Sequence, residues 1–223
     1  MFKPQAIFFD LDGLLLDTEP LHGQAWAKTA EILGSKLTTS QLILLRGQRR
    51  VECAKQLGIW LDQPVGVERI LEVHQPISKK IVGNSQAMPG AEHLVSWCFK
   101  HSLPMALVSS SASESVAFKC SNHPWIDLMK TKVLGDDILL KAGKPSPYPF
   151  LLAAKKLKVD PKKCWVFEDS LAGEKSALDA GCQVLILVEK NSSKAIKIDS
   201  SDWMNPLYIS NLANAIERLE KLL

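Results

Sequence analysis

Two carboxylates two residues apart, Asp10 and Asp12, follow a short apolar run at residues 6–9 and precede Gly13. An apolar run that ends in acids is typical of a buried strand that delivers the acids to its carboxyl edge. Gly13 gives the backbone the freedom to leave the strand in a sharp turn. Two such carboxylates can bind a hard cation, and one can serve as a nucleophile while the other transfers protons. Taken alone, the pattern is weak evidence for a site, because it occurs in many ordinary turns and calcium-binding loops.

Three further segments place reactive side chains at the ends of apolar runs or before a helix. Ser109 follows the apolar run at residues 105–108, and Glu168 and Asp169 follow another apolar run. Lys144 lies between these segments, where prolines stiffen the chain before a predicted helix. An acid pair is also favoured at any helix N-terminus, and a serine run is often only a loop. The four segments occur in this order along the chain, mostly at the ends of strand-like runs.

This order of nucleophile, hydroxyl, lysine and acid pair resembles the four motifs of the haloacid dehalogenase-like (HAD) phosphotransferase superfamily, over nearly the whole chain. The resemblance implies a phosphoryl transfer in which Asp10 is the nucleophile and forms an aspartyl-phosphate. Asp12 is then expected to protonate the leaving oxygen and later to deprotonate water. We expect a neighbouring carboxylate and partial burial to raise the pKa of Asp12, which would favour its protonated form.

The resemblance also implies a Mg²⁺ ion, because two carboxylates and a phosphoryl group can crowd together only around a cation. The implied ligands are the carboxylate of Asp10, the backbone carbonyl of Asp12 and the carboxylate of Asp169. Glu168 is expected to support these ligands or to serve as an occasional one. Oxygen ligands in octahedral geometry suit Mg²⁺.

The residues expected to bind the transferring phosphoryl group are Gly13, Ser109, Ser110 and Lys144. Ser109 should donate a hydrogen bond to a phosphoryl oxygen, with the backbone amide of Ser110 nearby at a helix start. Lys144 should neutralise the nucleophile and the transferring group. The predicted catalytic residues are therefore Asp10, Asp12, Ser109 and Lys144.

Between the first two strand-like runs, the alternation of strand and helix patterns stops and helical patterns continue instead. We expect residues 19–85 to form a helical cap domain, inserted in a core made of residues 1–18 and 86–223. The cap contains a compact basic cluster, in which Arg46 and Arg50 could bind the far end of a substrate. The simpler alternative for these arginines is a solvated surface.

The predicted cap resembles that of beta-phosphoglucomutase-like members of the superfamily. His22 and Trp26 stand where that subgroup has a histidine and a tryptophan, so His22 is a candidate substrate-binding residue and Trp26 a core residue. The loop at residues 45–50 is similar to the subgroup's Lys/Arg-Gly-x-Ser-Arg pattern, but Arg49 occupies the position of the usual Ser or Thr. This departure leaves the mutase assignment open.

Outside the predicted cap, the elements that must position these residues alternate between strand and helix patterns. Strand-like runs recur at residues 6–9, 105–108, 165–167 and 184–188. The alternation predicts an α/β fold, with a doubly wound, mainly parallel sheet and helices on both faces. The helix after the acid pair is expected to end at Gly181.

Turn-forming and capping residues mark the expected ends of other helices. The cap helix that carries Trp26 should stop at Gly34, and a second cap helix, from residue 51, should stop at Gly58. Residues 83–90 have the composition of a hinge or linker. A last helix should begin with Ser210 as its N-cap and form one apolar face, made of Leu212, Ile216, Leu219 and Leu223.

Composition limits the class of protein and of partner. The chain has 223 residues, 46% hydrophobic residues and a net charge of +3, which is ordinary for a globular protein and too small a charge to indicate a nucleic-acid partner. We read no signal peptide and no membrane span, and the five scattered cysteines suit reduced core thiols. We therefore expect a cytoplasmic protein, a monomer, whose partner is a small phosphorylated metabolite.

The leading hypothesis is a Mg²⁺-dependent phosphatase that acts on a small phosphorylated metabolite, with a sugar phosphate as one candidate. The alternative is a phosphosugar mutase of the beta-phosphoglucomutase type, which uses the same aspartyl-phosphate but excludes water. A phosphate-sensing or partner-binding protein without activity ranks third, and the presence of both Asp10 and Asp12 argues against it.

Overall fold

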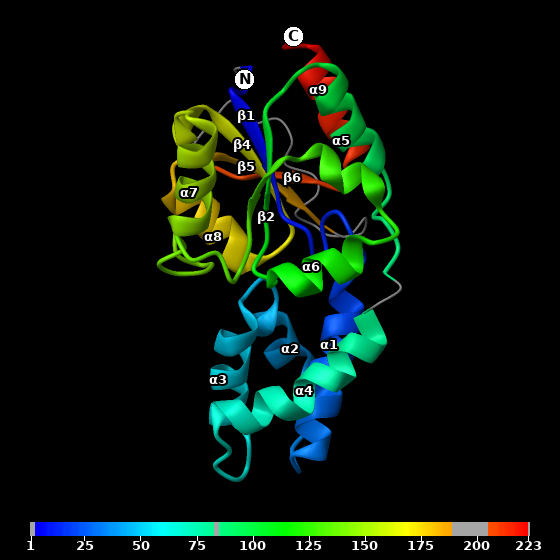
Figure 1. Cartoon of the computed structure of the whole chain (residues 1–223), viewed down its shortest axis with the longest axis vertical. Helices are drawn as coiled ribbons and strands as arrows, with labels where there is room; N and C mark the ends of the chain where they lie inside the picture. The colour runs from blue at the N-terminus through cyan, green and yellow to red at the C-terminus, as the bar shows by residue number, and fades with distance from the viewer. Residues whose placement is uncertain (1–2, 83–84, 189–204, 223) are drawn as a thin grey trace.

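The computed structural model describes residues 3–82, 85–188 and 205–222. Within these residues, six strands form one sheet in the order β3-β2-β1-β4-β5-β6, and every neighbouring pair is parallel (Figure 1). The strands are β1 (Ala6–Phe9), β2 (Met105–Val108), β3 (Thr131–Val133), β4 (Cys164–Glu168), β5 (Gln183–Leu187) and β6 (Leu207–Ile209). The predicted fold class is confirmed, and the described sheet is parallel throughout rather than only mainly so.

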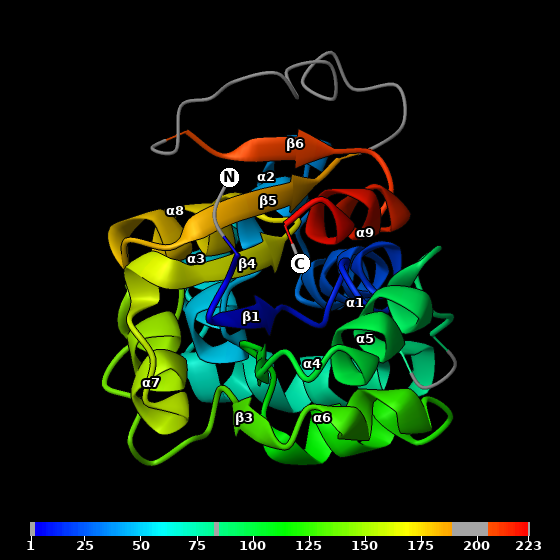
Figure 2. The same cartoon turned by 90° about the horizontal axis from the view of Figure 1, so that it is seen from above.

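Side chains of the central strand alternate between two apolar layers. Ile7 and Phe9 of β1 belong to one buried cluster, and Phe8 belongs to another, as the two-residue period of a strand requires. Helices α5 (Ala91–Lys100), α6 (Ser113–Cys120) and α9 (Ala213–Glu220) lie on one side of the sheet, and α7 (Tyr148–Leu157) and α8 (Leu171–Asp179) lie on the other (Figure 2). Two short 3-10 helices, Pro124–Leu128 and Pro161–Lys163, complete the connections.

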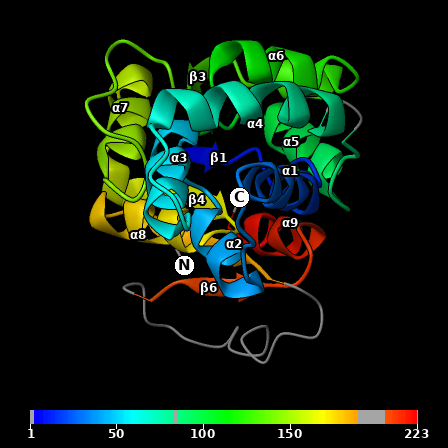
Figure 3. The ribbon, with the colours of Figure 1, turned by 90° about the horizontal axis from the view of Figure 1, so that it is seen from below.

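Four helices lie together at the carboxyl edge of the sheet (Figures 1 and 3). They are α1 (Glu19–Ile32), α2 (Thr39–Leu45), α3 (Arg50–Trp60) and α4 (Val67–Val82). These helices bury an apolar cluster of their own, which includes Trp26, Leu57 and Ile70. A third layer of helices therefore faces the strand ends at which the predicted catalytic residues lie.

Two of the predicted helix limits are wrong. Helix α3 does not stop at Gly58 but continues to Trp60, because Gly58 lies where α3 packs against α4. A Cβ atom at Gly58 would lie 3.4 Å from the side chain of Ile70, so the glycine permits close packing rather than ending the helix.

The N-terminus of α9 is the second correction. Ser210 is not the N-cap, because α9 starts after Leu212, and the Asn211 side chain accepts a hydrogen bond from the Ala213 N–H at 2.9 Å. Leu212, Ile216 and Leu219 form the expected buried face, while Leu223 lies outside the described residues. Residues 83–84 of the predicted linker also lie outside them.

The other predicted stops are confirmed. Helix α1 ends at Ile32 just before Gly34, and α8 ends at Asp179 just before Gly181, with both glycines at positive φ. In the described parts of the chain, no helix combines the length and the apolar character needed to cross a bilayer.

Candidate active site

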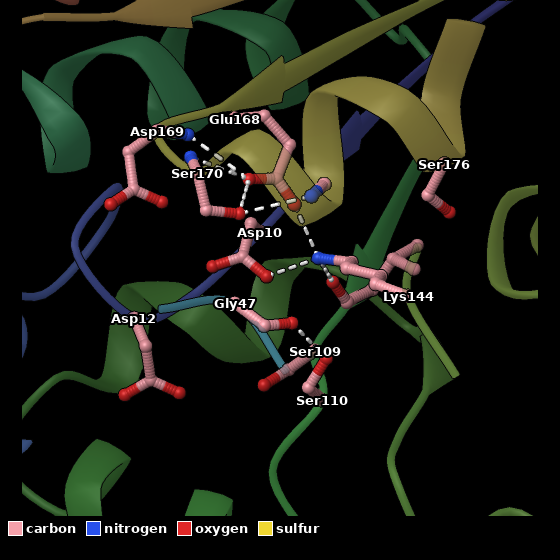
Figure 4. A network of polar contacts seen from close by, with 12 residues as sticks. Asp10, Asp12, Gly47, Ser109, Ser110, Lys144, Glu168, Asp169, Ser170 and Ser176 are labelled. Atoms are coloured by element: carbon pink, nitrogen blue, oxygen red, sulfur yellow. Dashed lines mark hydrogen bonds and ion pairs between the residues drawn. The ribbon is translucent and has the colours of Figure 1, made fainter. Parts of the chain in front are cut away.

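The parallel register brings the ends of three neighbouring strands together. Phe9 of β1 pairs with Phe167 of β4, so that Asp10 and Glu168 follow at the same level of the sheet. Ser109 directly follows β2, the neighbour of β1 on its other side. The residues predicted from separate parts of the sequence therefore meet at one edge (Figure 4).

Lys144 lies at the centre of this group, and only 2% of it is exposed. Its Nζ forms an ion pair with Asp10, a second with Glu168 at 2.5 Å, and donates a hydrogen bond to the Val108 carbonyl at 3.0 Å. Burial would lower the pKa of Lys144, but the carboxylates of Asp10 and Glu168 outweigh burial and raise it. The lysine therefore stays charged between two acids.

Asp10 is the acid that faces Lys144 from β1. Burial raises the pKa of Asp10 to about 7 against the opposing charge of Lys144, and the charges of Glu168 and Asp12 add to the increase. A carboxylate must be ionised to act as a nucleophile, so a further cation beside Asp10 would favour the reactive form.

In the acid pair at the end of β4, the two carboxylate oxygens of Glu168 have different partners. One oxygen of Glu168 receives Lys144, and the other accepts hydrogen bonds from the Asp169 N–H, the Ser170 N–H and the Ser170 hydroxyl at 3.0–3.2 Å. Carboxylate oxygens of Asp10, Glu168 and Asp169 lie within 4.8 Å of one another. This all-oxygen set has the chemistry that suits a hard divalent cation. Glu168 already has hydrogen-bond donors on both of its oxygens, which leaves this carboxylate less able to bind a cation.

Asp12 has a different environment from Asp10, and its carboxylate points away from Asp10 (Figure 4). It accepts a hydrogen bond from Thr18 at 2.7 Å and from Ser111 at 2.9 Å, and it contacts His22 at 3.1 Å. Lys119 binds both of its oxygens, at 2.5 and 2.6 Å. Burial opposes ionisation, but Lys119 and His22 together hold the pKa of Asp12 well below its usual range.

The expectation of a raised pKa for Asp12 is therefore wrong. That expectation considered only the neighbouring carboxylate and burial, whereas a lysine 107 residues away supplies the stronger influence. The available signal was helical spacing, because Lys119 follows Val116 by three residues in α6 and shares its buried face. A lysine on an apolar helix face indicates a buried partner.

The serines after β2 have separate contacts. The Ser109 hydroxyl accepts a hydrogen bond from the Ser111 N–H at 3.1 Å, and Ser109 is buried beside the strand ends. The Ser110 hydroxyl donates to the carbonyl of Gly47 at 2.7 Å, so its side chain binds the loop between α2 and α3. Ser110 thus connects the core to the helical layer.

A cavity of about 790 Å³ lies between the strand ends and helices α1–α4. Asp10 and Asp12 line it from the core, and His22, Arg46 and Arg50 line it from the helices. The predicted cap residues and two of the predicted catalytic residues therefore face one space. Its volume lies in the range of small-molecule sites.

Known proteins with similar sequences extend this description. Residues 7–187, most of the chain, match the family of haloacid dehalogenase-like hydrolases. The chain belongs to this family.

Several relatives of this HAD-like hydrolase carry phosphatase names. One, from Drosophila melanogaster, is named probable pseudouridine-5'-phosphatase and is 33% identical, over 83% of this chain and 82% of its own length. Another is the bifunctional riboflavin kinase/FMN phosphatase of Arabidopsis thaliana, 31% identical over 91% of this chain. This chain spans about half, 53%, of that longer relative. A solved HAD hydrolase of family IA, variant 3, from Entamoeba histolytica has a TM-score of 0.77 and 25% identity, with 97% and 98% of the two chains covered.

In this HAD-like hydrolase, the loop between α2 and α3 fits closely against the core. Gly47 has φ +73°, and a Cβ atom there would lie 2.1 Å from the Ser170 hydroxyl. Arg49, which replaces the expected Ser or Thr, forms an ion pair with Glu52 at 2.9 Å and packs against Gly143. The loop therefore contacts the segments that carry the lysine and the acid pair.

Proposed function

We propose that this enzyme is a Mg²⁺-dependent phosphatase that hydrolyses a small phosphorylated metabolite through an aspartyl-phosphate at Asp10. The observation that carries the proposal is the contact of Asp10 with Lys144, beside the oxygen cluster of Asp10, Glu168 and Asp169. The cavity lined by Asp10 and Asp12 supplies room for the ester.

In the first step, a carboxylate oxygen of Asp10 attacks the phosphorus and the ester P–O bond breaks. Lys144 and the Ser109 hydroxyl stabilise the charge on the transferring group. The leaving oxygen receives a proton from Asp12, which must first have bound one. An alcohol departs and the aspartyl-phosphate remains.

In the second step, a water molecule gives a proton to Asp12 and attacks the phosphorus. The bond between phosphorus and Asp10 breaks, inorganic phosphate leaves, and the carboxylate of Asp10 is restored. The low pKa of Asp12 suits this step, because an ionised carboxylate is needed to accept the proton.

The chain also provides ligands for the proposed Mg²⁺ ion, namely Asp10, Asp169 and the backbone carbonyl of Asp12. When bound, the ion neutralises negative charge around the phosphoryl group. The role proposed for Glu168 is to orient Lys144 and the turn after β4, since its oxygens are occupied by Lys144 and by groups of that turn.

Replacement of Asp169 by alanine tests the metal site. The Mg²⁺ concentration needed for half-maximal activity should rise by more than ~10-fold, because even residues that only support metal ligands cost that much in affinity. Asp179→Ala, on the exposed end of α8, serves as the matched control and should leave the titration unchanged. Equal Mg²⁺ dependence of the Asp169→Ala and wild-type enzymes would contradict the assignment.

We further propose that the substrate is a phosphate ester whose organic part is the size of a sugar or a nucleoside. The relatives' names refer to FMN and to pseudouridine 5'-phosphate, and a cavity of about 790 Å³ can hold groups of that size. The proposed cap, residues 19–85, would then bind the organic part through His22, Arg46 and Arg50.

Alanine at Arg46 or Arg50 tests this role. The kcat/KM for sugar and nucleoside phosphates should fall by roughly 10- to 100-fold, the range for hydrogen bonds to charged groups. Acetyl phosphate, which lacks a distal group, should be hydrolysed nearly as before. Arg69→Ala, at an exposed ion pair on α4, is the control. Equal losses on both kinds of substrate would exclude distal binding, and a parallel assay for sugar isomers would detect mutase activity.

A further inference from the structure

A second buried lysine lies at the active site besides Lys144. Lys119 of α6 is 2% exposed, and its Nζ contacts the two oxygens of Asp12 at 2.5 and 2.6 Å. The same Nζ donates to the Ser111 hydroxyl at 2.8 Å, and this hydroxyl donates to Asp12 at 2.9 Å. Asp12, Ser111 and Lys119 thus form a closed three-membered network.

A lysine at this place is not the residue that packing alone would select. Val116, one turn earlier on α6, belongs to the apolar cluster beneath the sheet, and an apolar side chain could continue that face. A buried ammonium group is costly unless it is paired, and well-packed apolar residues often stabilise a protein as much as a buried ion pair. The lysine therefore has a use that depends on its contact with Asp12.

The contacts of Asp12 are arranged unequally around its two oxygens. Thr18 and His22 contact Oδ1, and Ser111 contacts Oδ2. Among the hydrogen bonds of the described residues, that of Lys119 is the one that reaches both oxygens. Lys119 therefore fixes the rotation of the carboxylate plane, and it also holds the hydroxyl that supports Oδ2.

We propose that Lys119 is a positioning residue for the reaction, which holds the Asp12 carboxylate in the orientation needed for proton transfer to the leaving oxygen. The proposal rests on the function proposed above for Asp12. Lys119 does not line the main cavity, whereas Asp12 and Ser111 do. Its effect therefore reaches the substrate through Asp12, whose orientation it fixes.

A double-mutant cycle tests the proposal with the full chain and Mg²⁺. Wild type, Lys119→Met, Asp12→Asn and the double variant are assayed for kcat/KM on phenyl phosphate and p-nitrophenyl phosphate. The two esters have nearly the same size, but phenolate is the poorer leaving group and depends more on protonation. The ratio kcat/KM reports the step in which the leaving group departs.

The expected result has two parts. On phenyl phosphate, Asp12→Asn should lower kcat/KM by ~100-fold or more, as for other general acids. Lys119→Met should lower it by about tenfold, with a much smaller loss on p-nitrophenyl phosphate. The double variant should match Asp12→Asn within a factor of about three, because residues that act as a unit are non-additive.

The proposal would be overturned if the fold-losses of the two single variants multiply in the double variant. Full activity of Lys119→Met would overturn it as well. If Asp12→Asn instead lowers kcat/KM equally on the two esters, the acid role of Asp12 is overturned. The cycle would then still decide whether Lys119 acts through Asp12. Lys175→Met, an exposed lysine on α8, is the matched control and should behave as wild type.

Thermal unfolding shows whether each variant is folded. Should Lys119→Met not fold, Lys119→Gln takes its place in the cycle, since an amide can donate to one oxygen but cannot span both. A loss of activity in Lys119→Gln that is independent of Asp12 would likewise overturn the proposal.

Discussion

Replacement of Asp10 by asparagine is expected to reduce phosphatase turnover to background, a loss on the order of 10⁴-fold or more, as for other nucleophiles. Asparagine keeps the shape of the side chain but cannot form the aspartyl-phosphate. Lys144 retains Glu168 as a partner, so the fold should persist. Turnover with a metabolite panel and thermal unfolding of the same samples measure the two effects separately.

The control for this substitution is Asp17→Asn, an exposed aspartate seven residues later. It should keep full activity. Intact-mass spectrometry after brief exposure to acetyl phosphate should detect phosphorylated protein for wild type and none for Asp10→Asn. Near-normal turnover by a purified, folded Asp10→Asn enzyme would remove the nucleophile assignment.

The second large effect is expected for Lys144→Met, which should abolish activity and also lower stability. The substitution leaves Asp10 and Glu168 buried side by side without their cation. Removal of one partner from a buried ion pair costs about 3–5 kcal/mol of unfolding free energy. Urea unfolding measures this loss, and Lys155→Met on the exposed face of α7 is the control.

A second substitution separates the two roles of Lys144. Lys144→Met combined with Glu168→Gln removes one of the uncompensated charges, so part of the lost stability should return. Activity should not return, because no side chain then neutralises the transferring phosphoryl group. Recovery of activity together with stability would mean that Lys144 acts only on the fold.

The central strands could be predicted from the sequence because each is a short apolar run that ends in a polar residue. Predicted runs at residues 6–9 and 105–108 coincide with β1 and β2. The edge strands β3 and β6 were not predicted, since each has three residues and contains a polar or aromatic side chain. Runs of that length cannot be told from loops by periodicity.

In the candidate site, too, features set by the local sequence could be predicted, and features set by tertiary contacts could not. Asp10, Glu168 and Ser109 could be found because each directly follows or ends a strand, and Lys144 because of its order in the chain. The state of Asp12 could not be inferred, since it depends on Lys119, which only tertiary packing brings close. Sequence order predicts which groups react, whereas the charge state of these groups depends on contacts between distant residues.

The apolar cluster of helices α1–α4 shares no residue with the two clusters that flank the sheet. Substitutions in that small cluster would therefore weaken its helices before they weaken the strands that carry Asp10 and Glu168. The residues proposed to bind the organic part of the substrate and the residues proposed to break its phosphate ester should thus tolerate mutation separately. Such a division would let new substrate preferences arise, in evolution or in directed selection, while the bond-breaking chemistry is inherited unchanged.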